Sequence, residues 1–310
     1  MNLFITPLRN RNSILLLSLL LGVVWGKGAQ WTEWTALPAL AVVMTLSTLG
    51  VSGRAFRSFR GLVLPALAGI GMNYLILGSF LLGLNLVMIH EASLWVGFVL
   101  IAAVPPAVAV IPFTYFLNGD SHLSLLGMMG AYLAALVLMP AIMLGLIGPG
   151  FVSSGKLITI MLELILVPVI ISRILLWAGV SSHIDRIKGP ITNWSFFLVS
   201  YTIVGLNREL ILGQPFFLLP VAIIAVASTF LLGWGIEAVG KLFHLPSEKV
   251  ISLVLLGTLK NYGLAGGLAL ALFGKTTSVP ATVSSVFMII YIIWLEFKAR
   301  RGHSAGSQGA

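Results

Sequence analysis

The sequence predicts an all-α integral membrane protein that forms a single unit over residues 1–310. Of the 310 residues, 58% are hydrophobic and 9% are charged, and the mean hydropathy is +1.06. These values are typical of proteins that cross a membrane several times. The apolar residues also fall into runs long enough to span a bilayer as helices. No polar stretch is long enough for a soluble enzyme domain, and the absence of cysteine excludes disulfides and thiolate chemistry.

Ten apolar runs, separated by polar residues, glycine and proline, are predicted to be transmembrane helices. The first run follows Arg9 and Arg11 and resembles the apolar part of a signal peptide. Gly26-Lys27-Gly28-Ala29 is a poor cleavage site, however, so we expect a retained helix. The polar tail 302–310 is predicted to be disordered. The runs cover residues 13–26, 34–52, 61–86, 93–117, 123–147, 156–178, 191–212, 215–239, 249–273 and 277–297.

Basic residues in the loops predict the orientation. Cytoplasmic loops of membrane proteins are enriched in lysine and arginine. With ten spans, thirteen basic residues fall on the side of the termini and four on the other, which predicts a multi-pass protein of the cell membrane with both termini in the cytoplasm. The same distribution explains the net charge of +9 without a nucleic-acid partner. The thirteen are Arg9, Arg11, Arg54, Arg57, Arg60, Arg173, Arg186, Lys188, Lys241, Lys249, Lys298, Arg300 and Arg301, and the four are Lys27, Lys156, Arg208 and Lys275.

The fourth and ninth spans are both interrupted near their centres. Pro105-Pro106 removes two backbone donors from the fourth span, which predicts a break in that helix. In the ninth, Gly257 and Gly263 flank a polar group of Thr258, Lys260 and Asn261. Because the two spans lie five apart, they predict two inverted repeats, 13–147 and 156–297, whose broken helices meet at a midplane binding site. The alternative is an ordinary proline kink together with glycines that serve close packing.

Lys260 is the single charged residue between Val250 and Phe273. A charge at the centre of a bilayer costs at least about 2.5–3.5 kcal/mol, so such a residue normally faces a cavity or a partner. Three roles are open. Lys260 could bind an anionic substrate with the help of positive half-helix N-termini, or it could exchange a proton, because burial disfavours the charged form. The third role is a structural ion pair, for which Glu163 in the sixth span is the candidate partner.

Several short motifs resemble the bile acid:sodium symporter superfamily, which includes bile acid, pantothenate, pyruvate and arsenite transporters. Asn261-Tyr262-Gly263-Leu264-Ala265 is similar to the family's Asn-Ser-Gly-Leu-Ala, and the interval from Asn73 to Pro105 fits that between a third-span glutamine and the crossover proline. The resemblance implies ten helices in two inverted repeats. Spans 1, 2, 6 and 7 would form a panel, and spans 3–5 and 8–10 a core in which spans 4 and 9 cross. The remaining motifs are Val96-Gly97 through Pro105, Thr114-Tyr115, Asn118-Gly119 and Leu123-Ser124.

The resemblance also exposes a conflict at the family's sodium sites. The side chains expected to ligate sodium fall on Val110, Ile111, Met128 and Leu256, which offer no oxygen, whereas sodium requires oxygen ligands. Asn73 and Ser124 remain, but two neutral ligands are insufficient. The family's ninth-span glutamine falls on Lys260, whose ammonium would repel sodium and could take over the electrostatic role of the ion. We therefore expect no cofactor and no ordinary sodium coupling.

These observations predict a secondary transporter of a small or amphipathic organic anion, rather than an enzyme, which works by alternating access within the lipid bilayer. Without sodium, coupling would be proton symport, exchange or facilitated efflux. Two alternatives remain: a sodium-coupled symporter with a rebuilt ion site, and a membrane sensor that does not transport. An arsenite exporter is disfavoured, because those relatives use an intramembrane cysteine. The predicted binding residues are Lys260, Asn261, Thr258, Gly263, Pro105, Pro106, Asn73 and Ser124.

Overall fold

The computed structural model describes residues 11–49, 59–148, 155, 159, 163, 167–213 and 216–306. Within these residues every element is helical, which confirms the all-α class. The described residues also contain one isolated antiparallel β-bridge, between Pro106 and Lys260. The elements are α1 (Arg11–Val24), η2 (Gly26–Gly28), α2 (Ala29–Thr32), η3 (Glu33–Thr35), α3 (Ala36–Thr48), α4 (Phe59–Ile70), η5 (Gly71–Gly78), α5 (Ser79–Met88), α6 (Ala92–Ala103), α7 (Val110–Phe116), α8 (Ser121–Leu146), α10 (Val167–Trp177), α11 (Ser181–Leu206), α12 (Arg208–Gly213), α13 (Leu219–Val226), η7 (Ala227–Leu231), α14 (Leu232–Leu242), α15 (Ser247–Thr258), α16 (Tyr262–Leu272) and α17 (Lys275–Gly306).

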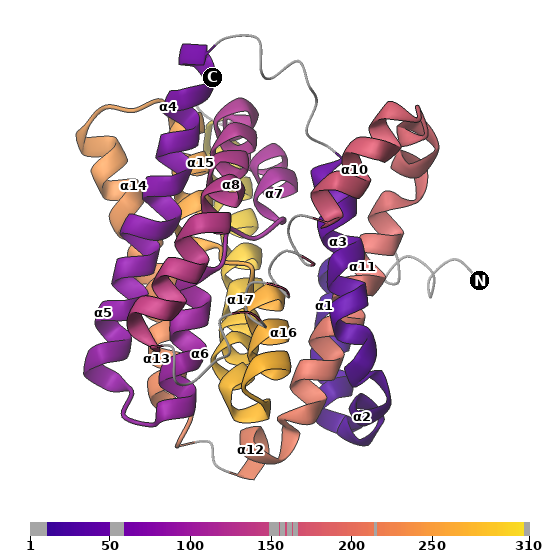
Figure 1. The fold of residues 1–310 in the computed structure, drawn as a ribbon. Coiled ribbons are helices and arrows are strands. Elements are labelled where there is room, and N and C mark those ends of the chain that lie inside the picture. The colour runs from indigo at the N-terminus through magenta and orange to yellow at the C-terminus, as the bar shows by residue number, and fades with distance from the viewer. Residues whose placement is uncertain are drawn as a thin grey trace.

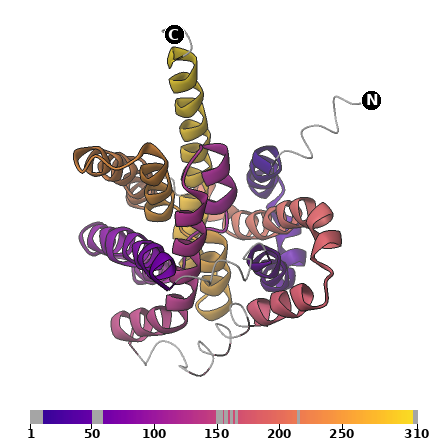
Figure 2. The same ribbon diagram turned by 90° about the horizontal axis from the view of Figure 1, so that it is seen from above.

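The helices form two groups that stand side by side (Figures 1 and 2). In the smaller group, α1 and α3 pack on α11, and α10 packs on α3. We call this group the panel. The larger group, which we call the core, contains the remaining long helices, including α4 on α8 and α6 and α16 on α17. The two groups meet mainly where α3 and α11 contact α16 and α17.

Within the described residues, each predicted span overlaps one helix or two to three consecutive helical segments. The sixth is described as a continuous helix only from Val167. Among the described residues, four helices are long and apolar enough to cross a membrane: Leu62–Met88, Ser121–Leu146, Leu219–Leu242 and Lys275–Ala299. The pair Ser13–Val24 and Gly26–Leu46 would make a fifth, bent by 97°. The protein is therefore a multi-pass membrane protein, while the count of ten spans stays a prediction.

The fourth and ninth spans are broken where the sequence predicts. Helix α6 ends at Ala103, and α7 begins at Val110 beyond Pro105-Pro106. Helix α15 ends at Thr258, and α16 begins at Tyr262. The third and eighth spans share a different irregularity, since each contains a π-helical segment, η5 and η7 respectively. Both kinds of irregularity thus recur at an interval of five predicted spans.

The ends of the molecule carry different loops. Figure 1 shows α2 and α12 at one end and the α14–α15 connection and the C-terminus at the other. Helix α17 continues to Gly306, so residues 302–306 are helical and the predicted disordered tail 302–310 is wrong for them. Glutamate, lysine, arginine and alanine before Gly302 are good helix formers and explain the extension. Residues 307–310 lie outside the described part of the chain.

Candidate functional site

The two breaks pair with each other through their backbones. The amide of Ala107 donates to the carbonyl oxygen of Leu259 at 2.9 Å, and the amide of Asn261 donates to that of Pro105 at 3.1 Å. These two hydrogen bonds make the antiparallel bridge between Pro106 and Lys260. Because prolines carry no amide donor, the other carbonyl oxygens around the break need partners from elsewhere.

Lys260 supplies two of the missing donors. In an uninterrupted helix the carbonyl oxygen of Ala102 would accept from the amide of residue 106, but Pro106 has none. The Lys260 ammonium donates instead, with Nζ 2.7 Å from the Ala102 oxygen and 2.8 Å from the Val104 oxygen. Val104 is the C-cap of α6. The lysine therefore replaces the amide that Pro106 lacks at Ala102 and also binds the carbonyl oxygen of Val104 at the end of α6.

The described residues that contact the Lys260 ammonium are uncharged. The side chain is completely buried, and its Nζ lies 4.7 Å from the centroid of the Tyr74 ring. Within the described residues, Lys260 forms no ion pair. Glu163, the partner suggested by the sequence, is exposed, so the predicted pair is not formed in this conformation. The positive charge is held by carbonyl groups and an aromatic face without an acidic partner.

Helix dipoles explain why a cation is stable at this position. The C-terminal end of a helix carries a partial negative charge from its unbonded carbonyl groups. The ammonium of Lys260 sits on this end of α6, where a cation is favoured. The N-terminal ends of α7 and α16, which carry partial positive charge, follow directly after the two breaks. The partial charges of the two helix C-terminal ends and the two N-terminal ends at the breaks roughly cancel. The full charge of Lys260 therefore makes the crossover electropositive.

Asn73 joins the same group of atoms from η5. Its Nδ2 donates to the Val104 oxygen at 3.3 Å, so Val104 accepts from both Asn73 and Lys260. The other amide atom, Oδ1, is buried and has no hydrogen-bond partner among the described residues. A buried acceptor of this kind is costly and is often retained for function. π-helical segments such as η5 are also frequent at functional sites.

Asn261 connects the crossover to the panel. Its Oδ1 accepts from the amide of Leu264 at 3.1 Å and so caps the N-terminus of α16. Its Nδ2 lies 3.3 Å from the Tyr132 hydroxyl and 3.6 Å from the Met44 sulfur. The Tyr132 hydroxyl donates to the Pro106 oxygen at 3.1 Å. Met44 belongs to α3 of the panel, and this contact is one that a movement between panel and core would break.

The positions expected to ligate sodium are packed as hydrophobic core. Val110, Met128 and Leu256 are buried in one apolar cluster, and Ile111 packs against it. Ser124, a remaining oxygen ligand, accepts a hydrogen bond from Thr114 at 2.7 Å. The described residues also contain no group of three His, Cys, Asp or Glu side chains that could hold a metal. These side chains do not fit a sodium ion.

The structure brings together Lys260, Asn261, Asn73, Pro105 and Pro106, while other predicted residues play local roles. Thr258 donates to the Val254 oxygen at 2.7 Å within its own helix. Gly257 supports the alternative of close packing, because an added Cβ would lie 2.6 Å from the Met72 methyl group. At Gly263 an added Cβ would make ordinary contacts, 3.7 Å to Leu40 and 3.8 Å to Val199 in the panel.

Three residues at the site were not predicted. Tyr74 lies under Lys260, and Tyr132 and Met44 contact Asn261. Each is an apolar or aromatic residue inside an apolar span, so its type alone gives no functional signal. The position of Tyr74 next to Asn73 is the one sequence feature that could have suggested it.

Comparison with known protein families identifies a related group of membrane proteins. A family model described as "Sodium Bile acid symporter family" matches residues 37–214, just over half of the chain. The matched range contains the diproline but ends before α15, so Lys260 lies outside it. No curated protein sequence matches the chain.

Proposed function

The chain belongs to the sodium bile acid symporter family, and we propose that it is a secondary transporter of a small or amphipathic organic anion in which Lys260 replaces the coupled sodium ion. Membership makes it a membrane protein of a transporter family rather than an enzyme. The substrate class, the role of the lysine and the alternating-access cycle are our proposal.

One observation carries this proposal. The Lys260 ammonium is completely buried and donates to the Ala102 and Val104 oxygens at 2.7 and 2.8 Å. A bound cation would use the same carbonyl oxygens at the end of a broken helix. A tethered ammonium supplies the positive charge permanently, so the crossover needs no ion from solution. The apolar packing of Val110, Met128 and Leu256 agrees with this view.

In this arrangement Lys260 attracts an anion without touching it. Two of its three donors bind carbonyl oxygens, and the side chain has no exposed surface. The charge still raises the potential at the crossover, because buried charges are weakly screened. An anion that binds between panel and core would then be held by the N-terminal ends of α7 and α16.

The proposed cycle moves the core against the panel. The recurrence of broken helices in spans four and nine and of π-helical segments in spans three and eight supports two inverted repeats, which commonly give the two access states of a transporter. The contact of Met44 with Asn261 lies on the boundary that would open. We propose further that both termini lie in the cytoplasm, as the basic residues in the loops predict.

The test is uptake of labelled organic anions into vesicles that contain the purified protein. Flux should be the same in sodium, potassium and choline buffers of equal ionic strength, and the protein should not be specifically stabilised by sodium. Flux that requires sodium would contradict the replacement by Lys260 and favour a rebuilt ion site. Saturable binding without flux would instead indicate a membrane sensor.

A further inference from the structure

A second group of cationic residues lies at the end of the molecule that carries α2 and α12 (Figure 1). Lys27, Arg208 and Lys275 line one polar hollow of about 130 Å³, together with Gln30 and Glu209. They are three of the four basic residues that the sequence places on the side opposite the termini. Basic residues are scarce on this predicted side of the membrane, yet three of the four line the same hollow.

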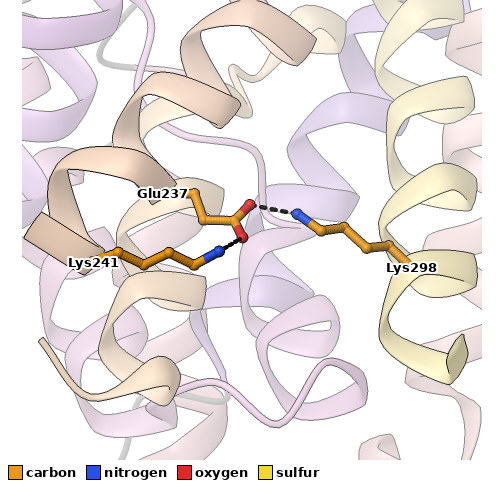
Figure 3. Close-up of polar contacts among 3 residues, drawn as sticks. All are labelled: Glu237, Lys241 and Lys298. Atoms are coloured by element: carbon orange, nitrogen blue, oxygen red, sulfur yellow. Dashed lines mark hydrogen bonds and ion pairs between the residues drawn. The ribbon is translucent and has the colours of Figure 1, made fainter. Parts of the chain in front are cut away.

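The charges in this hollow are not neutralised by one another. Among the described residues, neither the three basic side chains nor Glu209 form an ion pair. The opposite end of the molecule is different: there Glu237 accepts from Lys241 at 2.7 Å and from Lys298 at 2.5 Å (Figure 3). Three basic groups with one unpaired acid leave a net positive charge, which focuses a positive potential inside a hollow.

The local structure orients these side chains. The Arg208 Nε donates to the carbonyl oxygen of Val23, which fixes the guanidinium while its Nη groups have no partner among the described residues. Gly26 permits this approach, because an added Cβ would lie 2.9 Å from the Arg208 Cδ. Lys275 is the first residue of α17, where a cation adds to the positive end of the helix dipole. An anion would relieve this repulsion.

An apolar hollow of about 300 Å³ adjoins the basic one. One contact links the two hollows, because Val23 lines the apolar one and its carbonyl oxygen accepts from Arg208, which lines the basic one. The apolar hollow lies between α1, α11, α13 and α17 and is lined almost entirely by aliphatic side chains and Phe287. Trp25 and Trp31, on either side of Lys27, are 55% and 72% exposed, as expected for residues at the membrane interface.

We propose that Lys27, Arg208 and Lys275 form a binding site for the oxyanion group of an amphipathic molecule whose hydrocarbon part lies in the adjoining apolar hollow. The basic hollow has room for one carboxylate, sulfate or phosphate group, which suits a guanidinium and two ammonium groups. Lys27 belongs to the panel side and Lys275 to the core, so a bound oxyanion would bridge the two groups of helices. Identifying the ligand with the transported anion rests on the proposed function, whereas the binding itself does not.

Binding can be tested without transport. Decanoate below its micelle concentration is titrated into the full chain in phosphatidylcholine nanodiscs by calorimetry, with empty nanodiscs as the blank. The comparison ligands are decanol, which lacks the acid, and potassium sulfate, which lacks the hydrocarbon. We expect saturable binding of decanoate, weaker binding of sulfate, and no signal above the blank for decanol.

The decisive variant is Lys27→Gln with Lys275→Gln, because neither side chain makes a hydrogen bond within the described residues and its loss should not disturb folding. It should weaken decanoate binding about tenfold or more, the loss expected for charge-assisted contacts. Lys241→Gln with Lys249→Gln removes the same charge at the opposite end and should leave the affinity unchanged. Equal affinity in the first variant, or equal binding of decanol, would overturn the site.

Further arms identify the source of the oxyanion and separate this inference from the proposed function. If phosphatidylglycerol in the nanodiscs competes with decanoate, the site is supported with a lipid head group as its ligand. Sulfate that binds as tightly as decanoate would overturn the role of the apolar hollow. Intact binding in a protein that shows no flux would contradict the proposed function and leave this site standing. If the protein transports anions and the variant Lys27→Gln with Lys275→Gln binds decanoate as tightly as the unchanged chain, the proposed function stands and this site is contradicted.

Discussion

Lys260 and Lys298 both place an ammonium group against oxygen atoms, but the oxygens and their surroundings differ. Lys260 is completely buried and donates to the backbone carbonyls of Ala102 and Val104. The side chain of Lys298 is 45% exposed, and it shares the Glu237 carboxylate with Lys241 (Figure 3). A full negative charge offsets the lysines at the surface, whereas helix-end carbonyls offset only part of the charge at the crossover.

The buried charge of Lys260 therefore destabilises the fold unless it is compensated, whereas the exposed charge of Lys298 has little effect on stability. Exposed ion pairs typically contribute between 0 and about 1 kcal/mol, because water solvates both partners and salt screens them. A buried ammonium loses its hydration and must be compensated inside the protein. The carbonyl oxygens of Ala102 and Val104 at the end of α6 provide that compensation. The crossover therefore keeps a net positive charge, while the Glu237 cluster ends with one lysine in excess at a solvated face.

The largest effect that the comparison predicts is that of Lys260→Met. Methionine fills a similar volume but leaves the buried Ala102 oxygen without a donor and the Val104 oxygen with only the Asn73 amide. An unsatisfied buried acceptor costs about 1–3 kcal/mol. Relief of the buried charge offsets part of this, so we expect a loss of about 2 kcal/mol in unfolding free energy and loss of anion flux. Thermal unfolding in detergent and vesicle uptake measure the two effects.

Lys298→Met is the matched control, because it removes the same group from the exposed cluster. It should change stability by less than about 1 kcal/mol and leave flux intact. If the two substitutions had equal effects on stability and flux, the distinction between the buried and the exposed lysine would fail.

Lys260→Gln sharpens the comparison by restoring an amide while removing the charge. Glutamine can donate to one or both carbonyl oxygens, so we expect about half of the stability loss of Lys260→Met. Flux should remain impaired, since the positive potential is gone. Sodium should not rescue it, because Val110, Met128 and Leu256 still offer no oxygen. The measurement is uptake by the variant in sodium and in choline buffers, and sodium-dependent recovery would show that other oxygens can build an ion site.

The sequence was informative about the fold because apolar runs and helix breakers act locally. Diproline in the middle of a helix removes two amide donors, and the sequence therefore predicted the break between Ala103 and Val110. The π-helical segments of spans three and eight were not predicted, because their apolar sequences look like those of an ordinary α-helix. The helical state of residues 302–306 was not predicted either. Their polar composition suggested disorder, but α17 continues through them.

The site was only partly predictable for a similar reason. A lone charge in an apolar span identified Lys260 as important, but its partners are backbone oxygens of another span, which no residue type reveals. Reasoning from charge alone therefore suggested Glu163, a residue that the structure leaves exposed. Tyr74 and Met44 were missed because tyrosine and methionine in apolar helices are ordinary core residues.

Tyr74 permits a finer test of how the buried charge is held. Tyr74→Phe keeps the ring below Lys260 and removes the hydroxyl that donates to the Ala131 oxygen at 3.1 Å, which should cost about 1 kcal/mol. Tyr74→Leu removes the ring as well and should cost about 1–2 kcal/mol more, the range for a desolvated cation–π contact plus lost packing. Repeating both substitutions in Lys260→Met isolates the contribution of the charge. An equal Phe-to-Leu difference in the two backgrounds would mean that the ring stabilises by packing alone.

The smallest effect is expected for Glu237→Gln at the exposed cluster. The substitution removes the carboxylate shared by Lys241 and Lys298, whose side chains are 72% and 45% exposed. Both lysines can return to water, and Lys298 retains its position over the Trp294 ring, 5.2 Å from the centroid. The loss of stability should therefore stay below about 1 kcal/mol and shrink further at high salt, because screening already weakens the pair. Thermal unfolding at low and high salt tests this, with Lys260→Met as the salt-insensitive reference. A large loss of stability that does not depend on salt would mean that Glu237 behaves as a buried ion-pair partner. The proposed contrast between the environments of Lys260 and Lys298 would then fail.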